Sequence, residues 1–411
     1  MTKEVVITGL GVVSPLGNTH EELFENLIAG QSGIAKIERF DVTDFPVQFG
    51  GEVRKFDATP YLHPKEIKRT SRYVQYMVHA AAMAVKDAGI EKDSIDINRA
   101  GVVVGSGMGG IECFTDNAVA LVNRGPGRMS PFFIPMAITN MGAGFVGINL
   151  GWRGPNWSVT SACATGNHAI IDAMNTILLG KADVMVAGGA EESVCPTAVG
   201  GFARMKALSR RNDAPAQASR PYDVDRDGFV IGEGAGAVVL ESREHAEARG
   251  AKILGVVKGY GASCDAYHMS TPLESGEGVA LAINEAIRDA GISKEDIGLI
   301  NGHSTSTPLG DIAEFKAIKR AFGSHIQDMQ LHSTKSLIGH SLGGASAIEA
   351  VVLVKTLNSG KVHPSINVDN QDPGIDMNVV PNKAQETKTE FGISNSFGFG
   401  GHNSCLIIQK G

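Results

Sequence analysis

The tetrapeptide Asp87-Ala88-Gly89-Ile90 returns about half the chain later as Asp289-Ala290-Gly291-Ile292. Each copy ends a helical pattern, and an acidic turn then leads into a short apolar strand pattern. A Ser/Thr-rich segment running into a small-residue helix follows in both copies, at 160–163 and 333–336, and an apolar strand closes each copy. A shared order of four elements indicates duplication. We therefore expect two related halves, residues 1–250 and 251–411, packed as one unit.

Strand and helix patterns alternate along the whole chain. The short β-branched runs are typical of buried parallel strands and lie at 5–7, 101–104, 183–186 and 237–240. Helical periodicity lies between them, for example at 76–87 and 167–179. This alternation predicts an α/β fold.

Composition excludes several classes of protein. The 411 residues include 37 Lys and Arg against 44 Asp and Glu, a net charge of −7, which argues against nucleic-acid binding. The five cysteines are scattered without a CxxC pair, which excludes a disulfide framework and a thiolate zinc site. The N-terminus resembles no signal peptide, and no apolar run reaches the roughly 18 residues of a membrane helix. We expect a cytoplasmic protein without membrane contact, or an organellar one whose transit peptide has been removed.

Cys163 is the candidate nucleophile. It lies in Thr160-Ser161-Ala162-Cys163-Ala164-Thr165-Gly166, where a predicted strand at 157–161 meets a helix. Unpaired N–H groups and the dipole of a helix start favour a thiolate over a thiol. The other four cysteines, Cys113, Cys195, Cys264 and Cys405, fit the commoner fate of a buried, inert thiol.

Two histidines lie in similar polar, small-residue surroundings. His303 follows the predicted strand at 299–300, and His340 follows the segment 333–339. Functional sites of open α/β sheets form at strand ends, so we expect both rings to lie near Cys163.

Another enzyme class remains open because Gly339-His340-Ser341-Leu342-Gly343 matches the nucleophile elbow of esterases. The residues before it are poor strand-core material, but acids at 369–376 and the histidines His363 and His402 could complete a triad. This alternative predicts Ser341 as the nucleophile.

Two further motifs carry less weight. The stretch 223–228 opens like a calcium loop, but its twelfth position is Gly234 rather than Glu, which favours a turn held by Asp side chains. Gly9-Leu10-Gly11 follows a strand without the rest of a dinucleotide motif.

The chain resembles the β-ketoacyl-[acyl carrier protein] synthases, the condensing enzymes of fatty-acid elongation, nearly from end to end. The motifs that carry the resemblance are Ser161-Ala162-Cys163-Ala164-Thr165-Gly166, the segments 227–236 and 303–311, Ser333-Thr334-Lys335-Ser336, Gly339-His340 and Asn395-Ser396-Phe397-Gly398-Phe399-Gly400-Gly401. Departures are Gly302 and Ser304, where the family more often has Ala and Gly, and His402, where Thr is also common. The resemblance implies a thiolase-like fold of two pseudo-symmetric halves in αβαβα layers, and a homodimer.

The implied reaction is the decarboxylative Claisen condensation of malonyl-[acyl carrier protein] with an acyl chain held on Cys163. By resemblance, the backbone N–H groups of Cys163 and Phe399 bind the thioester oxygen, and His303 and His340 act as neutral hydrogen-bond donors. Lys335, held by Glu349, disfavours a positive charge on either ring. Phe399 is expected to gate the acyl site.

The remaining implied contacts concern the substrate, a cation and the carrier protein. The substrate residues are Thr305 and Thr307 for the pantetheine arm, Met108 and Phe202 for the acyl chain, and Glu349. A structural Na⁺ or K⁺ site would use Asn301, Glu349, Ser394 and Asn395, and an acidic carrier protein would dock on Lys65, Lys68, Arg69 and Lys206. No catalytic metal and no resident cofactor is expected, since phosphopantetheine arrives on the carrier protein.

Two relatives of this reaction class fit less well. A thiolase needs a second catalytic cysteine in the C-terminal glycine-rich loop, and Cys405 lies just past that loop. A non-catalytic partner subunit, such as a polyketide chain-length factor, would lack Cys163.

Overall fold

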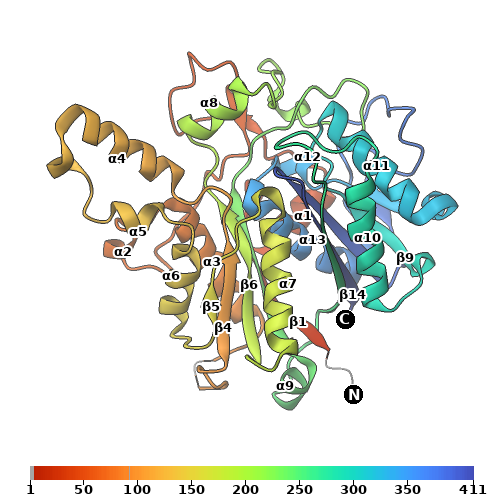
Figure 1. Ribbon diagram of the computed structural model, residues 1–411, viewed down its shortest axis with the longest axis horizontal. Helices are drawn as coiled ribbons and strands as arrows, with labels where there is room; N and C mark the ends of the chain where they lie inside the picture. The colour runs from red at the N-terminus through yellow and green to blue at the C-terminus, as the bar shows by residue number, and fades with distance from the viewer. Residues whose placement is uncertain (1–3, 92) are drawn as a thin grey trace.

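The computed structural model describes residues 4–91 and 93–411, and one ten-stranded sheet runs through it (Figure 1). The strands follow the order β10-β9-β13-β14-β8-β1-β7-β6-β4-β5. Their bounds are β1 Val5–Val13, β4 Ala100–Gly105, β5 Asn156–Trp157, β6 Val184–Glu191, β7 Gly234–Ser242, β8 Gly255–Cys264, β9 Ile297–Asn301, β10 Gln330–His332, β13 Phe391–Gly398 and β14 His402–Lys410. Two small ribbons, β2 (Ala35–Lys36) with β3 (Phe49–Gly50) and β11 (Lys361–Val362) with β12 (Gln385–Glu386), lie outside this sheet.

The strand order is the same in both directions from its centre. Outward from β1 the order is β7, β6, β4, β5, and outward from β8 it is β14, β13, β9, β10. The two sets meet where β1 pairs with β8, antiparallel, at Val5 opposite Val257. The duplication inferred from the repeated tetrapeptide is therefore visible in the topology.

One detail of the strand prediction is wrong. β4 and β6 are parallel as expected, but β7 runs antiparallel to both β1 and β6. A fully apolar run reports burial on both faces of a strand and carries no information about its direction.

Helices cover the two outer faces of the sheet and fill the space between its halves (Figure 1). α3 packs on β1 and β7, α10 packs on β8 and β14, and α7 and α13 pack against each other in the centre. The bounds are α1 His20–Ile28, α2 Pro64–Ile67, α3 Arg72–Asp87, α4 Ile111–Arg124, α5 Phe133–Ala137, α6 Met141–Leu150, α7 Thr165–Leu178, α8 Pro196–Arg204, α9 Arg243–Ala248, α10 Glu277–Ala290, α11 Pro308–Phe322, α12 Lys335–Ile338 and α13 Ala345–Ser359. None of these helices is long and apolar enough to span a bilayer.

Successive side chains along the strands point in turn to the central core and to an outer core, as this layering requires. Val103 belongs to the central core around α7 and α13, whereas its neighbours Val102 and Val104 pack in the outer core beneath α3. On β14, Leu406 points to the central core and Ile407 to the outer core beneath α10. Successive strand residues point to opposite faces, so both faces are buried. The predicted αβαβα arrangement is confirmed.

The nucleophile segment differs from its prediction. Only Asn156–Trp157 form a strand, and a 3₁₀ turn at Ala162–Ala164 then leads into α7. Its counterpart in the second half is the turn Leu342–Gly344 before α13, and Ala162 and Leu342 share a positive φ of 50° and 45°. The segment 333–336 was therefore the wrong match. It has the same composition but leads into the short α12 rather than into a central helix.

The Gly9-Leu10-Gly11 motif is explained by close packing of α3 on β1. A Cβ atom on Gly9 would lie 2.0 Å from the Ala84 carbonyl oxygen, and one on Gly11 would lie 1.9 Å from that of Ala80. The same close packing occurs on β8, where a Cβ atom on Gly261 would lie 1.9 Å from the carbonyl oxygen of Ala282 in α10. These glycines bring the helix backbone onto the sheet.

Substitution of Gly11 or Gly261 by alanine should therefore destabilise the protein, because the helix backbone must move away from the strand. We expect a loss of about 1–3 kcal/mol of unfolding free energy, seen as a lower Tm in calorimetry. Gly127→Ala is the control, since no atom lies within 4 Å of its added Cβ. Equal Tm values for Gly11→Ala and Gly127→Ala would contradict this account of the packing.

Candidate active site

Cys163 is held in a rigid turn directly before α7. Thr165 Oγ1 accepts a hydrogen bond from the Ser161 N–H (2.9 Å) and donates one to the Ala162 carbonyl (2.7 Å). Ser396 on β13, in the other half of the chain, donates its hydroxyl proton to the Cys163 carbonyl at 2.8 Å. The turn is thus held by residues of both halves of the chain. Cys163 is buried, with 8% of its surface exposed to solvent.

Two imidazole rings converge on this sulfur. His340 Nε2 lies 3.1 Å from Cys163 Sγ. The rings of His303 and His340 meet edge to face with centroids 5.4 Å apart, and ligand atoms of all three residues lie within 4.8 Å of one another. The structure thus brings together three residues that lie up to 177 positions apart along the chain.

Both rings are neutral at physiological pH. Burial lowers the pKa of His303 and of His340 well below the usual value, and the charge of Lys335 lowers each pKa further. Neither Nδ1 atom has a hydrogen-bond partner among the described residues. Neutral imidazoles can donate a hydrogen bond to a developing oxyanion without carrying charge themselves.

Burial opposes the thiolate that the position of Cys163 at a helix start was expected to favour. Burial raises the pKa of Cys163 to about 12, although Lys335 and the backbone N–H groups of Phe399 and Cys163 act to lower it. Desolvation of a thiolate outweighs these favourable contacts. The sulfur therefore needs a base when it attacks, and His340 Nε2 is the adjacent lone pair.

Lys335 forms a buried ion pair with Glu349. Its Nζ lies 2.5 Å from Glu349 Oε1, and both residues are 1% exposed. Burial raises the pKa of Glu349 to about 7, and Lys335 opposes that rise. Because the Glu349 carboxylate is enclosed behind Lys335, the expected contact between Glu349 and substrate is not supported.

Aromatic side chains form a row from the protein surface to His340. Phe399 is 37% exposed, and its ring centroid lies 6.4 Å from that of Phe202. The ring centroids of Phe202 and Phe229 are 5.4 Å apart, and those of Phe229 and His340 are 5.5 Å apart. The residues predicted for the acyl chain, Met108 and Phe202, also pack on the apolar cluster to which Cys163 belongs.

The predicted pantetheine contacts already bond to each other. Thr305 Oγ1 and Thr307 Oγ1 are 3.1 Å apart, and Thr307 Oγ1 also accepts the Gly310 N–H as the N-cap of α11. Thr305 and Thr307 lie on the loop that carries His303, two and four residues beyond it.

The predicted carrier-protein residues are exposed but do not form one patch on a single chain. Lys65, Lys68 and Arg69 lie on and just after α2, whereas Lys206 follows α8. Figure 1 shows α2 and α8 well apart, at the left and at the top of the molecule. Arg69 stacks over the Phe132 ring at 4.6 Å.

The four predicted cation ligands each carry a buried oxygen without a hydrogen-bond partner among the described residues. Asn301 and Ser394 are paired across β9 and β13. The unpartnered atoms are Asn301 Oδ1, Glu349 Oε2, Ser394 Oγ and Asn395 Oδ1. Asn167 Oδ1, which the sequence analysis did not include, is also unpartnered, and its Nδ2 bonds the Ser394 carbonyl at 3.3 Å.

Two buried carboxylates that position the site were missed. Glu314 on α11 accepts the N–H of His303 at 2.8 Å, and Glu191 on β6 accepts the N–H groups of Met108 and Gly343, both at 3.0 Å. Glu314 lies one helical turn after the buried Asp311, and this spacing of two acids was the available signal.

The esterase alternative lacks its geometry. Ser341 is 1% exposed, and its hydroxyl has no partner among the described residues, so no base activates it. His363 instead bonds His332 at 2.9 Å and Thr334 at 3.0 Å. The triad that this alternative requires is not formed.

Two minor expectations have clear outcomes. Asp223 is indeed a turn former, since it accepts Arg220 Nε at 2.9 Å and the Asp225 N–H at 2.8 Å. Cys113, Cys195 and Cys405 are buried, but Cys264 is exposed because β8 ends there and runs into a surface loop.

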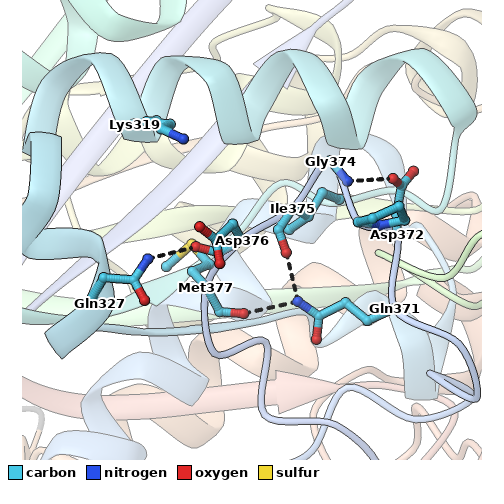
Figure 2. A pocket seen from close by; sticks show the side chains of 9 residues that line it. Lys319, Gln327, Gln371, Asp372, Gly374, Ile375, Asp376 and Met377 are labelled. Atoms are coloured by element: carbon cyan, nitrogen blue, oxygen red, sulfur yellow. Dashed lines mark hydrogen bonds between the residues drawn. The ribbon is translucent and has the colours of Figure 1, made fainter.

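A surface groove of about 620 Å³ is lined by Lys319, Gln327 and residues 371–377. Figure 2 shows that its amide groups bind backbone, Gln371 to the carbonyls of Ile375 and Met377, and Gln327 to that of Asp376. None of the residues gathered around Cys163 lines this groove. Its polar side chains shape a loop and offer no catalytic group.

Both halves of the chain are similar to known proteins. Models of the beta-ketoacyl synthase N-terminal and C-terminal domains match residues 2–246 and 254–369. The 3-oxoacyl-[acyl-carrier-protein] synthase 2 of Vibrio cholerae is 48% identical over 410 residues, covering 99% of both chains. The chloroplastic 3-oxoacyl-[acyl-carrier-protein] synthase I of Arabidopsis thaliana is 47% identical, covering 99% of this chain and 86% of that protein.

Solved structures agree over the whole length. A beta-ketoacyl synthase from Burkholderia phymatum superposes with a TM-score of 0.92 at 33% identity, covering 100% of both chains. A type II polyketide ketosynthase, solved in complex with its acyl-carrier protein and bound to the hexaketide, also gives 0.92 at 32% identity, with the same coverage. The thiolase-like fold is confirmed.

Proposed function

The chain belongs to the beta-ketoacyl synthase family, and we propose that it elongates acyl chains by decarboxylative condensation with malonyl-[acyl carrier protein]. The observation that carries this proposal is the convergence of Cys163 Sγ with His303 and His340. The relatives at 47–48% identity, which are 3-oxoacyl-[acyl-carrier-protein] synthases, support the same substrates.

In the first half-reaction the acyl group moves from the carrier to Cys163. His340 Nε2 takes the thiol proton across 3.1 Å while the sulfur attacks the thioester carbon. The oxyanion accepts hydrogen bonds from the N–H groups of Cys163 and Phe399, the same groups that lower the thiol pKa. The pantetheine thiolate leaves and recovers the proton from His340. Loss of one such donor typically costs about 3 kcal/mol of transition-state stabilisation.

In the second half-reaction malonyl thioester loses carbon dioxide, and the electron pair of the broken bond forms an enolate. His303 and His340 donate ring N–H groups to the enolate oxygen. His340 returns from the first half-reaction with its proton on Nδ1, so this proton must move to Nε2 before His340 can donate. Both Nδ1 atoms lack partners among the described residues, so no neighbour opposes that change of tautomer. The enolate carbon then attacks the acyl carbon, the bond to the Cys163 sulfur breaks, and the departing thiolate takes up one proton from solvent.

Replacement of the nucleophile tests this function directly. Cys163→Ala should abolish condensation, and intact-protein mass spectrometry after incubation with acyl-[acyl carrier protein] should show no acyl adduct. Ser341→Ala, the matched control, should keep the adduct and most of the activity, because its hydroxyl bonds to none of the described residues. An active Cys163→Ala protein, or an adduct on Ser341, would contradict the proposal.

The protein acts as a homodimer joined along β5. β5 is an outer strand of the sheet, and the opposite outer strand, β10, is covered by the bond from the Leu331 N–H to the Asn378 carbonyl. α6 packs on β5, and α4 and α5 project from the same side of the molecule (Figure 1). These helices expose large apolar side chains, including Val122 at 82% and Ile148 at 66%. An uncovered strand edge with neighbouring apolar surface is typical of a partner interface.

Charges introduced on this surface should separate the subunits. We expect the double variant Val122→Glu/Ile148→Glu to have the mass of a monomer in light scattering after size-exclusion chromatography, while the unmodified protein has that of a dimer. Leu281→Glu, on the exposed face of α10, is the control and should remain dimeric. A dimeric double variant, or a monomeric unmodified protein, would show that this surface is not the interface.

A monovalent cation fits three of the four residues predicted for it. Asn301 Oδ1, Glu349 Oε2 and Ser394 Oγ are hard oxygen donors, buried and without hydrogen-bond partners among the described residues, and Asn167 bonds the Ser394 carbonyl. Buried polar atoms are normally satisfied, so a bound ion explains their shared lack of partners. The ion would neutralise these oxygens and hold β9, β13 and α13 together next to Lys335. The Asn395 side chain points to the other face of β13, where its Nδ2 bonds Glu314 at 3.3 Å, so it does not share this ion.

Binding of such an ion should raise thermal stability. The Tm should be higher in KCl or NaCl than in choline chloride of equal ionic strength. Where the cation concentration exceeds the Kd of the site a hundredfold, the free energy of unfolding should rise by about 2–3 kcal/mol. Ser394→Ala should reduce the difference. Identical Tm values in the three salts would rule out the cation site.

The phosphopantetheine arm of the carrier protein is the prosthetic group of this reaction. It enters past Thr305 and Thr307. Docking involves Lys65, Lys68, Arg69 and Lys206, and the complex of a related ketosynthase with its acyl-carrier protein supports such an encounter. Phe399, exposed at the outer end of the aromatic row, acts as the gate. The protein works where its carrier protein is found, in the cytoplasm or within an organelle.

A further inference from the structure

The loop that carries His303 has an unusual backbone. Ser304, the next residue, has φ +30°, and Ser306 has φ +69°. Residues with a Cβ rarely adopt these angles and persist there only where surrounding contacts hold them. Ser304 is also one of the two residues flanking His303 at which this chain departs from the usual family pattern.

The Ser304 hydroxyl is held between two buried side chains. It accepts the hydroxyl proton of Tyr222 at 2.6 Å and donates its own to Glu314 Oε2 at 2.7 Å. The same carboxylate accepts the backbone N–H of Ser304 at 2.7 Å and that of His303 at 2.8 Å. Tyr222, Ser304 and Glu314 are each at most 2% exposed, so no water competes for these bonds.

Gly302 on the other side of His303 leaves the space that this hydroxyl fills. A Cβ on Gly302 would lie 2.3 Å from Ser304 Oγ, 2.9 Å from Leu331 Cδ1 and 3.0 Å from the Tyr222 hydroxyl. Gly302 does not have a positive φ, so it is needed here for space rather than for backbone freedom. Gly302 and the Ser304 side chain are therefore sterically coupled.

We propose that Ser304 is a positioning residue for His303, acting through the buried hydroxyl chain Tyr222–Ser304–Glu314, and that Gly302 is required because Ser304 is present. The inference rests on the proposed function, in which His303 stabilises the enolate. His303 acts in the second half-reaction, whereas Cys163 and His340 suffice for the first. Loosening the 302–306 loop should therefore slow decarboxylative condensation more than acylation of Cys163.

The test measures the two half-reactions separately. Acylation is followed by the acyl adduct on Cys163 in intact-protein mass spectrometry, and condensation by release of carbon dioxide from malonyl-[acyl carrier protein]. Ser304→Ala removes the hydroxyl and keeps the positive φ. We expect condensation to fall about 10- to 100-fold, with acylation within about twofold of the unmodified protein, because small misplacements of a catalytic group have effects of this size.

A double-mutant cycle tests the coupling. Gly302→Ala should lose most condensation activity, and Gly302→Ala/Ser304→Gly should recover part of it, because the second change removes Ser304 Oγ, the nearest of the three atoms that the new Cβ meets. Tyr222→Phe removes only the outer hydroxyl, and it replaces Ser304→Ala in the test if that variant does not fold.

The outcomes separate the two proposals. An unmodified protein that forms no adduct on Cys163 overturns the proposed function itself. If the unmodified protein is active, the positioning role is overturned by any of three results. These are normal condensation in Ser304→Ala, equal losses in the two half-reactions, and no recovery in the double variant.

Discussion

The structure depends on the contact between the starts of two central helices, α7 from the first half and α13 from the second. Gly166 at the start of α7 allows this contact, since a Cβ there would lie 2.5 Å from the Ala347 backbone nitrogen. The Asn167 N–H donates to Ser346 Oγ at 2.9 Å, and that hydroxyl lies 3.4 Å from the Cys163 carbonyl. A residue with a positive φ, Ala162 or Leu342, opens the 3₁₀ turn before each helix, and Cys163 Sγ and His340 Nε2 lie 3.1 Å apart next to this contact.

Burial shifts the pKa of the reacting groups in the site. It lowers the pKa of both imidazoles and raises that of the thiol, and the buried ion pair of Lys335 with Glu349 lies close to them. Such a site can form the thiolate transiently, when substrate accepts its charge, and then offer neutral donors to the enolate. Fixed N–H groups and uncharged rings need little reorganisation during either half-reaction, which is the general advantage of a preorganised site.

The sequence allowed the duplication, the α/β class and the convergence of Cys163, His303 and His340 to be predicted, because each leaves a local pattern, whereas the layered arrangement followed from the family resemblance. Other features leave none. The direction of β7 depends on its partner strands rather than on its own apolar residues. The raised pKa of the thiol results from the balance of burial against nearby charges. The bond from Tyr222 to Ser304 joins residues 82 positions apart, and neither residue alone indicates the other.

The central claim is that one oxyanion position and two imidazoles surround a single sulfur. A crystal structure of the protein acylated on Cys163 tests it most directly. Our account predicts the thioester oxygen about 3 Å from the backbone nitrogens of both Cys163 and Phe399, with the His303 and His340 rings facing the acyl carbon from the other side. A thioester oxygen turned towards the rings, or a His303 ring out of reach of the acyl carbon, would contradict it.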